Sequence, residues 1–192
     1  TQSIFIELFK SGAIIEDLRP NIYDPVEGTT IADAEVERLS RKTRLVDITW
    51  TCDDGTEIVI STTRPELICA CGVVAVHPDD ERYTHLVGKT IQLPLPVEGR
   101  STSVKVMTHN SVKSDFGSGV LMVCSFGDQN DVAVFRELGL TPFQAIDLDG
   151  KLTDIAGPFS GMKVMDARNA AIDYLEEHGK LVNVVERDQE IP

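Results

Sequence analysis

The chain has 192 residues, 42% of them hydrophobic, which is enough to bury the core of one domain but short for two. Its 18 basic and 31 acidic side chains give a net charge of −13, which argues against a protein that grips a polyphosphate unaided. An apolar run of the ~20 residues that span a bilayer is absent, and so is a basic-then-apolar leader, so we expect a cytoplasmic protein. The four cysteines lack zinc-site spacing and are expected to be reduced, buried thiols.

The predicted elements begin with a helix and continue as a series of strands. Residues 3–12 resemble the last turns of a helix that glycine stops, but no capping residue precedes them, so we interpret them as a helix cut from a longer protein. Short β-rich runs follow, separated by turn residues. These runs predict strands over residues 45–50, 57–62, 72–77, 90–93, 104–108 and 120–124.

Two amphipathic helices are predicted in the second half of the chain. The first follows Asp128, has apolar residues at 132, 135 and 138, and ends at Gly139. The second carries an apolar stripe over residues 164–175 and ends at Gly179. This order of elements predicts an α+β fold, a compact β-barrel or curved sheet with peripheral helices, and not alternating βαβ units.

The first polar motif is Thr62, Thr63 and Arg64, where a β-branched strand runs into Pro65, a residue suited to the first position of a helix. Such a corner presents two hydroxyls, free amide donors and a guanidinium, which together can hold a ribose, a phosphate or an ordered water. Capping of the helix by a threonine is the simpler interpretation of the same residues.

The second polar motif has two parts, a Gly-Ser-Gly turn and a pair of aspartates. Gly117 and Gly119 flank Ser118 before an apolar strand, which permits close approach of a ligand, although a bulge or tight turn explains them equally well. Asp128 and Asp131 are spaced as an N-cap and its capping-box partner, and this structural interpretation fits the spacing best. The functional alternative is that Asp131 turns inward and pairs with a cationic group.

Other site chemistries are not indicated. The four histidines are scattered, and the sequence has no compelling Ser-His-Asp order, metal loop or P-loop, so we expect no metal and no cofactor. Positive charge concentrates in residues 82–113, the basic segment, which holds five basic residues against Glu98 alone. We expect nucleic acid to approach this segment, and to bind the chain weakly and in a salt-sensitive way.

Three motifs together resemble the editing (CP1) domain of valyl-tRNA synthetases, a class I aminoacyl-tRNA synthetase family. They are Ser-Thr-Thr-Arg-Pro-Glu-Leu at 61–67, Val-Ala-Val-His-Pro-Asp-Asp-Glu-Arg-Tyr at 74–83, and Phe-Gly-Ser-Gly-Val at 116–120 with Gly-Asp-Gln-Asn-Asp at 127–131. The similarity covers most of residues 5–190, and the residues within the motifs are of the archaeal type. Isoleucyl and leucyl enzymes share single motifs, but isoleucyl enzymes usually have tryptophan after the proline.

The resemblance implies a single editing domain over residues 1–192, excised from a larger synthetase, with residues 1–28 as a boundary segment and residues 29–192 as the editing core. It implies hydrolysis, without metal or cofactor, of the aminoacyl ester of mischarged tRNA, most specifically threonyl-tRNA(Val). The implied partners are the mischarged tRNA 3′ end and the remainder of the synthetase. A non-catalytic tRNA-docking insert and the editing domain of an isoleucyl or leucyl enzyme stay open as alternatives.

The resemblance also implies roles for single residues. Thr62, Thr63 and Asp131 form the expected catalytic set, with Asp131 holding the ammonium group of the amino acid. The threonines and Arg64 are expected to bind the terminal adenosine and its ester. Leu67 and Met122 stand where many bacterial enzymes have threonine and lysine, so we expect an apolar pocket in which Cys124, Ser125 or main chain near Gly117 meets the threonine hydroxyl. The remaining expected substrate-binding residues are Gly117, Ser118, Gly119 and Asp128.

Overall fold

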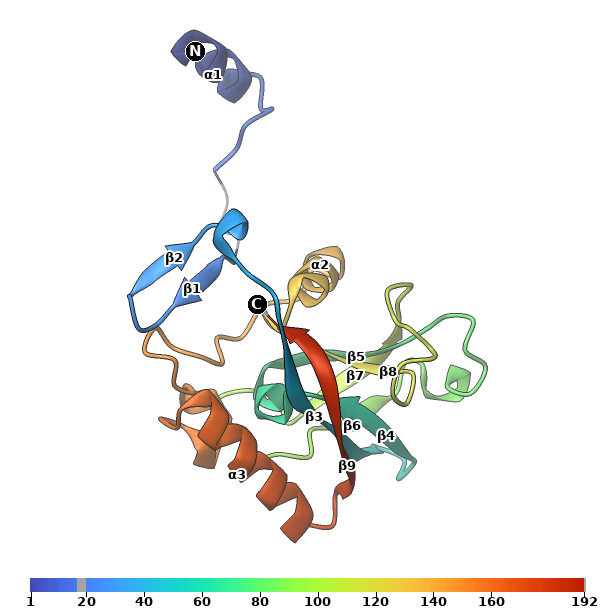
Figure 1. The fold of residues 1–192 in the computed structure, drawn as a ribbon. Coiled ribbons are helices and arrows are strands. Elements are labelled where there is room, and N and C mark those ends of the chain that lie inside the picture. Colours follow the sequence, from blue (N-terminus) through green and yellow to red (C-terminus); the bar gives the residue numbers. More distant parts are fainter. Residues whose placement is uncertain (17–19, 192) are drawn as a thin grey trace.

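The computed structural model describes residues 1–16 and 20–191 (Figure 1). Helix α1 (Gln2–Lys10) is followed by Gly12 at φ +75°, which confirms the predicted helix and its glycine stop. Strand β1 (Ile22–Asp24) then pairs antiparallel with β2 (Thr29–Ile31) in a small separate sheet.

A seven-stranded sheet forms the body of the molecule, and its path runs β4-β3-β6-β7-β5-β8, with β9 also paired to β3. All of its pairs are antiparallel except β5 with β7. Strands β4 and β8, at the two ends of the path, lie in contact, so the sheet is nearly closed. Its strands are β3 (Leu39–Cys52), β4 (Glu57–Thr62), β5 (Cys71–Val76), β6 (Thr90–Gln92), β7 (Ser103–Thr108), β8 (Val120–Cys124) and β9 (Leu181–Ile191).

Helices α2 (Gln129–Glu137) and α3 (Val164–Glu177) lie beside this sheet, whereas α1 lies apart from it, so the predicted α+β class with a barrel-like sheet is confirmed (Figure 1). The two predicted amphipathic helices are present as α2 and α3. Three short 3₁₀ helices lie between strands, η1 (Asp33–Glu35), η2 (Pro65–Ala70) and η3 (Thr84–Leu86), and a fourth, η4 (Asp154–Phe159), lies between α2 and α3.

The core forms because β3 and β4 alternate between buried and outward-facing side chains. In β3 the buried positions are Val46, Ile48, Trp50 and Cys52, while the residues between them are only half-buried. Helix α3 covers η2 and buries Ala167, Ala171 and Leu175. Element η2 is buried along its whole length, so the Thr62–Arg64 corner is fixed to the core on its C-terminal side.

Two features of the sheet differ from the prediction. Strand β3 begins at Leu39, six residues before the predicted start, and β9 was not predicted. The first part of β3 and most of β9 pair with each other as a ribbon whose side chains are largely exposed. Because neither face of this ribbon is buried in the core, its sequence lacks the apolar alternation by which half-buried strands are detected.

Candidate functional site

The corner after β4 turns sharply into η2. The Oγ1 atom of Thr62 accepts a hydrogen bond from the Arg64 amide at 3.1 Å, and Arg64 itself occupies the N-cap position. Threonine capping of the helix is therefore wrong in detail, because Thr62 closes a tight turn before the helix begins. Pro65 stands at the start of η2 as predicted, and Thr63 is half-buried between Thr62 and Arg64.

The side chain of Arg64 joins this corner to the segment that follows β8. Its Nη1 atom donates to the carbonyl oxygen of Gly127 at 3.1 Å, and its Nε atom donates to Glu66 Oε1 at 3.3 Å. Residues 64 and 127 are far apart in sequence but adjacent in the fold, because β4 and β8 lie in contact. The two polar motifs of the sequence therefore meet at one place.

The two aspartates of the second motif have different environments. Asp128 Oδ1 accepts a hydrogen bond from the Asp131 amide at 2.8 Å, which confirms Asp128 as the cap of α2. The carboxylate of Asp131 turns inward, where its Oδ2 atom accepts from the Cys124 amide at 3.2 Å, and the residue is only 8% exposed. The capping-box interpretation of Asp131 is therefore wrong, and its inward orientation agrees with the functional alternative.

Gly127 makes room for this carboxylate. A Cβ atom at residue 127 would lie 2.2 Å from Asp131 Oδ2, far closer than atoms can approach. The backbone of Gly127 has no positive φ, so glycine is required here by space and not by conformation. The site thus combines an arginine, a buried carboxylate and a glycine that permits their approach.

The environment of Asp131 disfavours its charge. Burial is the largest cause that raises the pKa of its carboxyl group, and the nearby charge of Asp128 also raises it, whereas the Cys124 amide and Arg64 act to lower it. The resulting pKa is about 7. A buried acid with such a pKa lacks a full countercharge. A ligand ammonium group at this position would supply one.

The Gly-Ser-Gly turn is held against the strand that carries the threonines. The Ser118 amide donates to Ser61 Oγ at 3.2 Å, and Ser61 Oγ donates to Asp47 Oδ1 at 2.6 Å. The Tyr83 hydroxyl donates to the Ser118 carbonyl oxygen at 2.6 Å. Gly117 has φ +56°, and a Cβ atom there would lie 2.7 Å from the Ser61 Cβ atom.

Sequence reasoning missed the residues that fasten this turn. Asp47 carries no motif beyond strand periodicity. Ser61 opens the Ser-Thr-Thr-Arg-Pro-Glu-Leu motif, and Arg82 and Tyr83 belong to the His-Pro-Asp-Asp-Glu-Arg-Tyr run, but these three residues were used only for the resemblance. Arg82 Nη2 donates to the Ser114 carbonyl oxygen at 2.9 Å. These two motifs were the sequence signals that could have pointed to Ser61, Arg82 and Tyr83. In the fold, Arg82 and Tyr83 bond to the main chain of residues 114–119.

Replacing Gly119 with alanine is expected to destabilise the protein by ~1–3 kcal/mol. Gly119 has φ +80°, and a Cβ atom would lie 2.5 Å from Arg82 Nη2 and 2.8 Å from the Ser114 carbonyl oxygen. The measurement is denaturant unfolding, with Gly99→Ala as the control, because Gly99 has φ +65° but open space around it. Equal losses in the two variants would mean that backbone strain alone accounts for the effect.

The residues expected around the substrate side chain are buried. Leu67 and Met122 are both core residues, and Cys124 Sγ donates to the Leu67 carbonyl oxygen at 3.2 Å. The Ser125 hydroxyl donates to the Ala70 carbonyl oxygen at 3.3 Å and accepts from the Phe143 amide at 2.7 Å. Because both polar side chains already bond to the main chain, main-chain groups near residue 117 are the remaining candidates for contact with a substrate hydroxyl.

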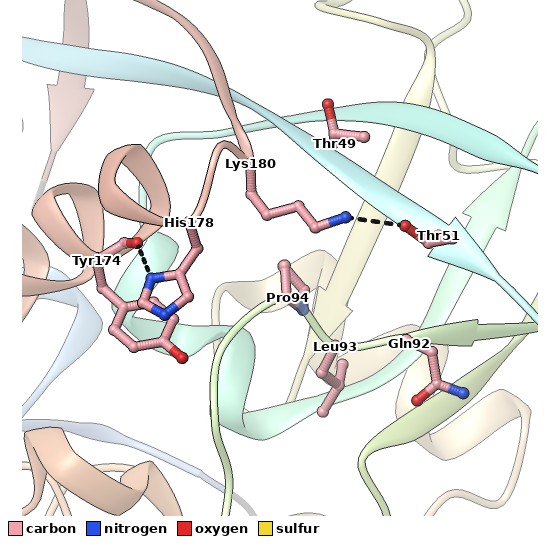
Figure 2. A pocket seen from close by; sticks show the side chains of 8 residues that line it. All are labelled: Thr49, Thr51, Gln92, Leu93, Pro94, Tyr174, His178 and Lys180. Carbon is pink, nitrogen blue, oxygen red and sulfur yellow. Dashed lines mark hydrogen bonds between the residues drawn. The ribbon is translucent and has the colours of Figure 1, made fainter. Parts of the chain in front are cut away.

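A cavity of about 270 Å³ lies elsewhere, between the end of α3 and the strands β3 and β6 (Figure 2). Lys180 Nζ donates there to Thr51 Oγ1 at 3.0 Å, and the His178 ring stacks on Tyr174 with ring centres 3.8 Å apart. A second cavity of about 320 Å³ lies beside the start of α3. None of the predicted site residues lines either cavity, so the candidate site rests on its convergent side chains and not on a hollow.

Three of the five cations in the basic segment serve the fold. Arg82 pairs with Asp80, and Lys89 Nζ lies 2.6 Å from Asp54 Oδ2. Arg100 donates to the Cys69 and Cys71 carbonyl oxygens at 2.7 and 2.6 Å. Lys105 and Lys113 are exposed. The charge of the basic segment that is available to a nucleic acid is therefore smaller than the sequence suggests.

The described part of the chain contains no group of three or more His, Cys, Asp or Glu side chains arranged to hold a metal ion. Within the same residues, no helix has the length and apolar character needed to cross a membrane.

Comparison with known proteins identifies relatives over nearly the whole chain. No family model matches. Valine–tRNA ligases match well: that of Aeropyrum pernix is 42% identical over 95% of the chain, that of Archaeoglobus fulgidus 41% over 100%, and that of Methanopyrus kandleri 44% over 93%. The chain spans only about a fifth of these relatives, 22%, 21% and 20% of their lengths.

Solved structures share the fold at low sequence identity. The Agrobacterium radiobacter K84 LeuRS in a ternary complex with tRNA and LeuAMS has a TM-score of 0.54 and 18% identity, over 79% of this chain and 20% of that one. The structure of GlLeuRS-CP1 also has a TM-score of 0.54, with 14% identity, over 68% of this chain and 84% of that one. The chain is therefore homologous over nearly its whole length to an insert-sized segment of valine–tRNA ligases, and it has the fold of a CP1 editing domain.

Proposed function

We propose that this domain hydrolyses the aminoacyl ester of mischarged tRNA, and that its substrate is threonyl-tRNA(Val). The observation that carries the proposal is the hydrogen bond from Arg64 to the Gly127 carbonyl oxygen, which brings the threonine corner beside the buried carboxylate of Asp131. The similarity to valine–tRNA ligases and the fold support the same conclusion.

In the proposed reaction, water attacks the ester carbonyl carbon and the bond between that carbon and the ribose oxygen breaks. The ribose oxygen takes a proton, and the products are free threonine and uncharged tRNA. Thr62 and Thr63 supply hydroxyls at the corner that orient the water together with main-chain groups and the ribose hydroxyl. Arg64 binds the terminal adenosine and its ester, while Asp131 pairs with the α-ammonium group.

The other proposed site residues surround the bound ester. Leu67 and Met122 supply apolar surface, while Gly117, Ser118 and Gly119 present main chain and Asp128 fixes the start of α2. A second site of this kind is useful because a hydrophobic pocket that binds valine rejects threonine, an isostere with an added hydroxyl, by only ~100-fold. A second site that selects for the hydroxyl can then hydrolyse the threonyl ester that escapes this rejection.

The proposed context is a larger cytoplasmic synthetase. Residues 29–192 are the proposed editing core and residues 1–28 a boundary segment, within one domain over residues 1–192. The proposed partners are the 3′ end of mischarged tRNA and the remainder of the synthetase. Because the chain carries a charge of −13, we expect most of the tRNA affinity to come from outside it.

Deacylation of threonyl-tRNA(Val) by the full-length protein tests the proposal. We expect hydrolysis of threonyl-tRNA(Val) to be much faster than that of valyl-tRNA(Val), and valyl-tRNA(Ile) serves as the substrate of the isoleucyl alternative. If the protein binds tRNA but hydrolyses none of these three esters, the non-catalytic docking insert would be the remaining function. Preference for valyl-tRNA(Ile) would reassign the substrate.

The rate of this hydrolysis is expected to fall as the pH decreases below about 7. The ammonium group can pair only with the ionised form of Asp131, whose pKa burial raises to about 7. After subtraction of the uncatalysed rate, kcat/KM should decrease about tenfold per pH unit on the acid side of this value. An acid limb centred near pH 4, the ordinary value for aspartate, would mean that Asp131 is not the group being titrated.

A further inference from the structure

A second buried carboxylate lies beside the candidate site and has no role in the function proposed above. Glu66 follows the Thr62–Arg64 corner in η2, and its side chain is 0% exposed. An ionised carboxylate removed from water in this way requires paired charge and hydrogen bonds. Two arginines supply them, one from the corner itself and one from α3.

Arg168 is the stronger of the two partners. Its Nε atom donates to Glu66 Oε2 at 2.9 Å and its Nη2 atom donates to Glu66 Oε1 at 2.7 Å, so the two groups form a bidentate pair. Arg168 comes from α3, 102 residues along the chain, and its side chain is 17% exposed. This pair alone neutralises Glu66 and fixes the plane of its carboxylate.

Arg64 makes a single, longer bond to the same carboxylate, from Nε to Oε1 at 3.3 Å. Its side chain is 35% exposed, and its Nη1 atom donates to the Gly127 carbonyl oxygen at 3.1 Å. A guanidinium has five N–H donors. These two bonds use two of them, so the remaining three are available to a ligand while the group is held at both ends.

We infer that Glu66 and Arg168 are positioning residues for Arg64 in ester hydrolysis, an inference that rests on the proposed function. The bidentate pair between Arg168 and Glu66 forms a fixed support, and the single bond to Nε sets the direction in which the Arg64 guanidinium points. A support built from α3 thereby orients a group that touches the substrate, without itself reaching the substrate.

The distinguishing variant is Glu66→Met/Arg168→Met in the full-length protein. Replacing a buried ion pair with apolar groups of similar volume is often neutral or stabilising, so this double variant is expected to fold. Arg64 then lacks the acceptor for its Nε atom, and we expect kcat/KM for threonyl-tRNA(Val) to fall about tenfold to a hundredfold, as for a misplaced catalytic group. Arg44→Met is the matched control, because it also removes an arginine bond to α3, at Asn169 next to Arg168.

The same double substitution is then made in an Arg64→Lys background. Lysine keeps the charge but has no Nε–H group to bond Glu66, so the double substitution should change the rate by less than about twofold there. A purely structural role of the Glu66–Arg168 pair would reduce the rate equally in both backgrounds, and that result would overturn the inference. Parental activity in Glu66→Met/Arg168→Met would do the same.

Hydrolysis by the unsubstituted parent protein tests the proposed function separately from the inference. Parental hydrolysis together with equal losses in the two backgrounds would remove the positioning role alone. An inactive parent would remove the proposed function and, with it, the inference. Thermal unfolding of each variant, compared with that of Arg44→Met, verifies that rate changes do not reflect loss of the folded state.

Discussion

Asp131→Asn is expected to abolish deacylation while leaving the protein at least as stable as the parent at pH 8. Loss of one member of a desolvated charge pair costs ~2–5 kcal/mol, or about 30-fold to several thousand-fold in rate. Stability moves the other way because burial raises the pKa of Asp131 to about 7, so its ionised form opposes folding. Asparagine removes that charge and keeps an oxygen that can accept the bond from the Cys124 amide.

The pH dependence of this stability difference is a second readout of the same variant. The folded-state pKa of Asp131 is raised, so the stability of the parent decreases as pH rises from about 4 to about 7, whereas asparagine does not titrate. The stability advantage of the variant should therefore be larger at pH 8 than at pH 5. Thermal unfolding and deacylation measured together test this, and a destabilised variant with near-parental hydrolysis would make Asp131 a structural residue.

Gly127→Ala is expected to lower deacylation to a similar extent, by about 30-fold or more, while the protein stays folded. A Cβ atom at this position would lie 2.2 Å from Asp131 Oδ2, so the carboxylate must move away from its place beside Arg64. The backbone conformation of residue 127 is open to alanine because its φ is not positive. The damage should therefore be local to the carboxylate.

The control for this variant is the same substitution made together with Asp131→Asn. If Gly127→Ala acts by displacing the carboxylate, it should have little further effect once that carboxylate is gone. Single-turnover deacylation of the parent, the two single variants and the double variant supplies the comparison. Additive losses would mean that Gly127 contributes to the site in another way, for example through the carbonyl oxygen that Arg64 binds.

The fold was predictable wherever the sequence reports burial on one face. Strand β4 was predicted with its observed bounds, and β8 likewise, because both carry β-branched residues between clear turn signals. The helices α2 and α3 were predictable from their apolar stripes and glycine stops. Strand β9 and the first part of β3 escaped because pairing between the two strands, not burial, holds them.

The sequence was sufficient to identify residues of the candidate site, but it did not predict how they are arranged in space. The spacing of Asp128 and Asp131 favoured two caps, and only the three-dimensional structure separates the capping carboxylate from the buried one. The bidentate pair between Glu66 and Arg168 is a contact across 102 residues between a 3₁₀ helix and an α-helix. No local pattern encodes such a contact, because it depends on how α3 docks on η2.

The ribbon of β3 and β9 also bears on how the chain folds. Its register joins Leu39 to Ile191 and Val46 to Val184, so each of its pairs closes a loop of well over a hundred residues. Closing such loops is entropically costly before other contacts form, and folds with many long-range pairs fold slowly. We therefore expect β3 and β9 to pair along the ribbon late in folding, after the β4, β5 and β8 region has formed. The exposed outer amides of the ribbon are expected to be among the first to exchange with deuterium in the native protein.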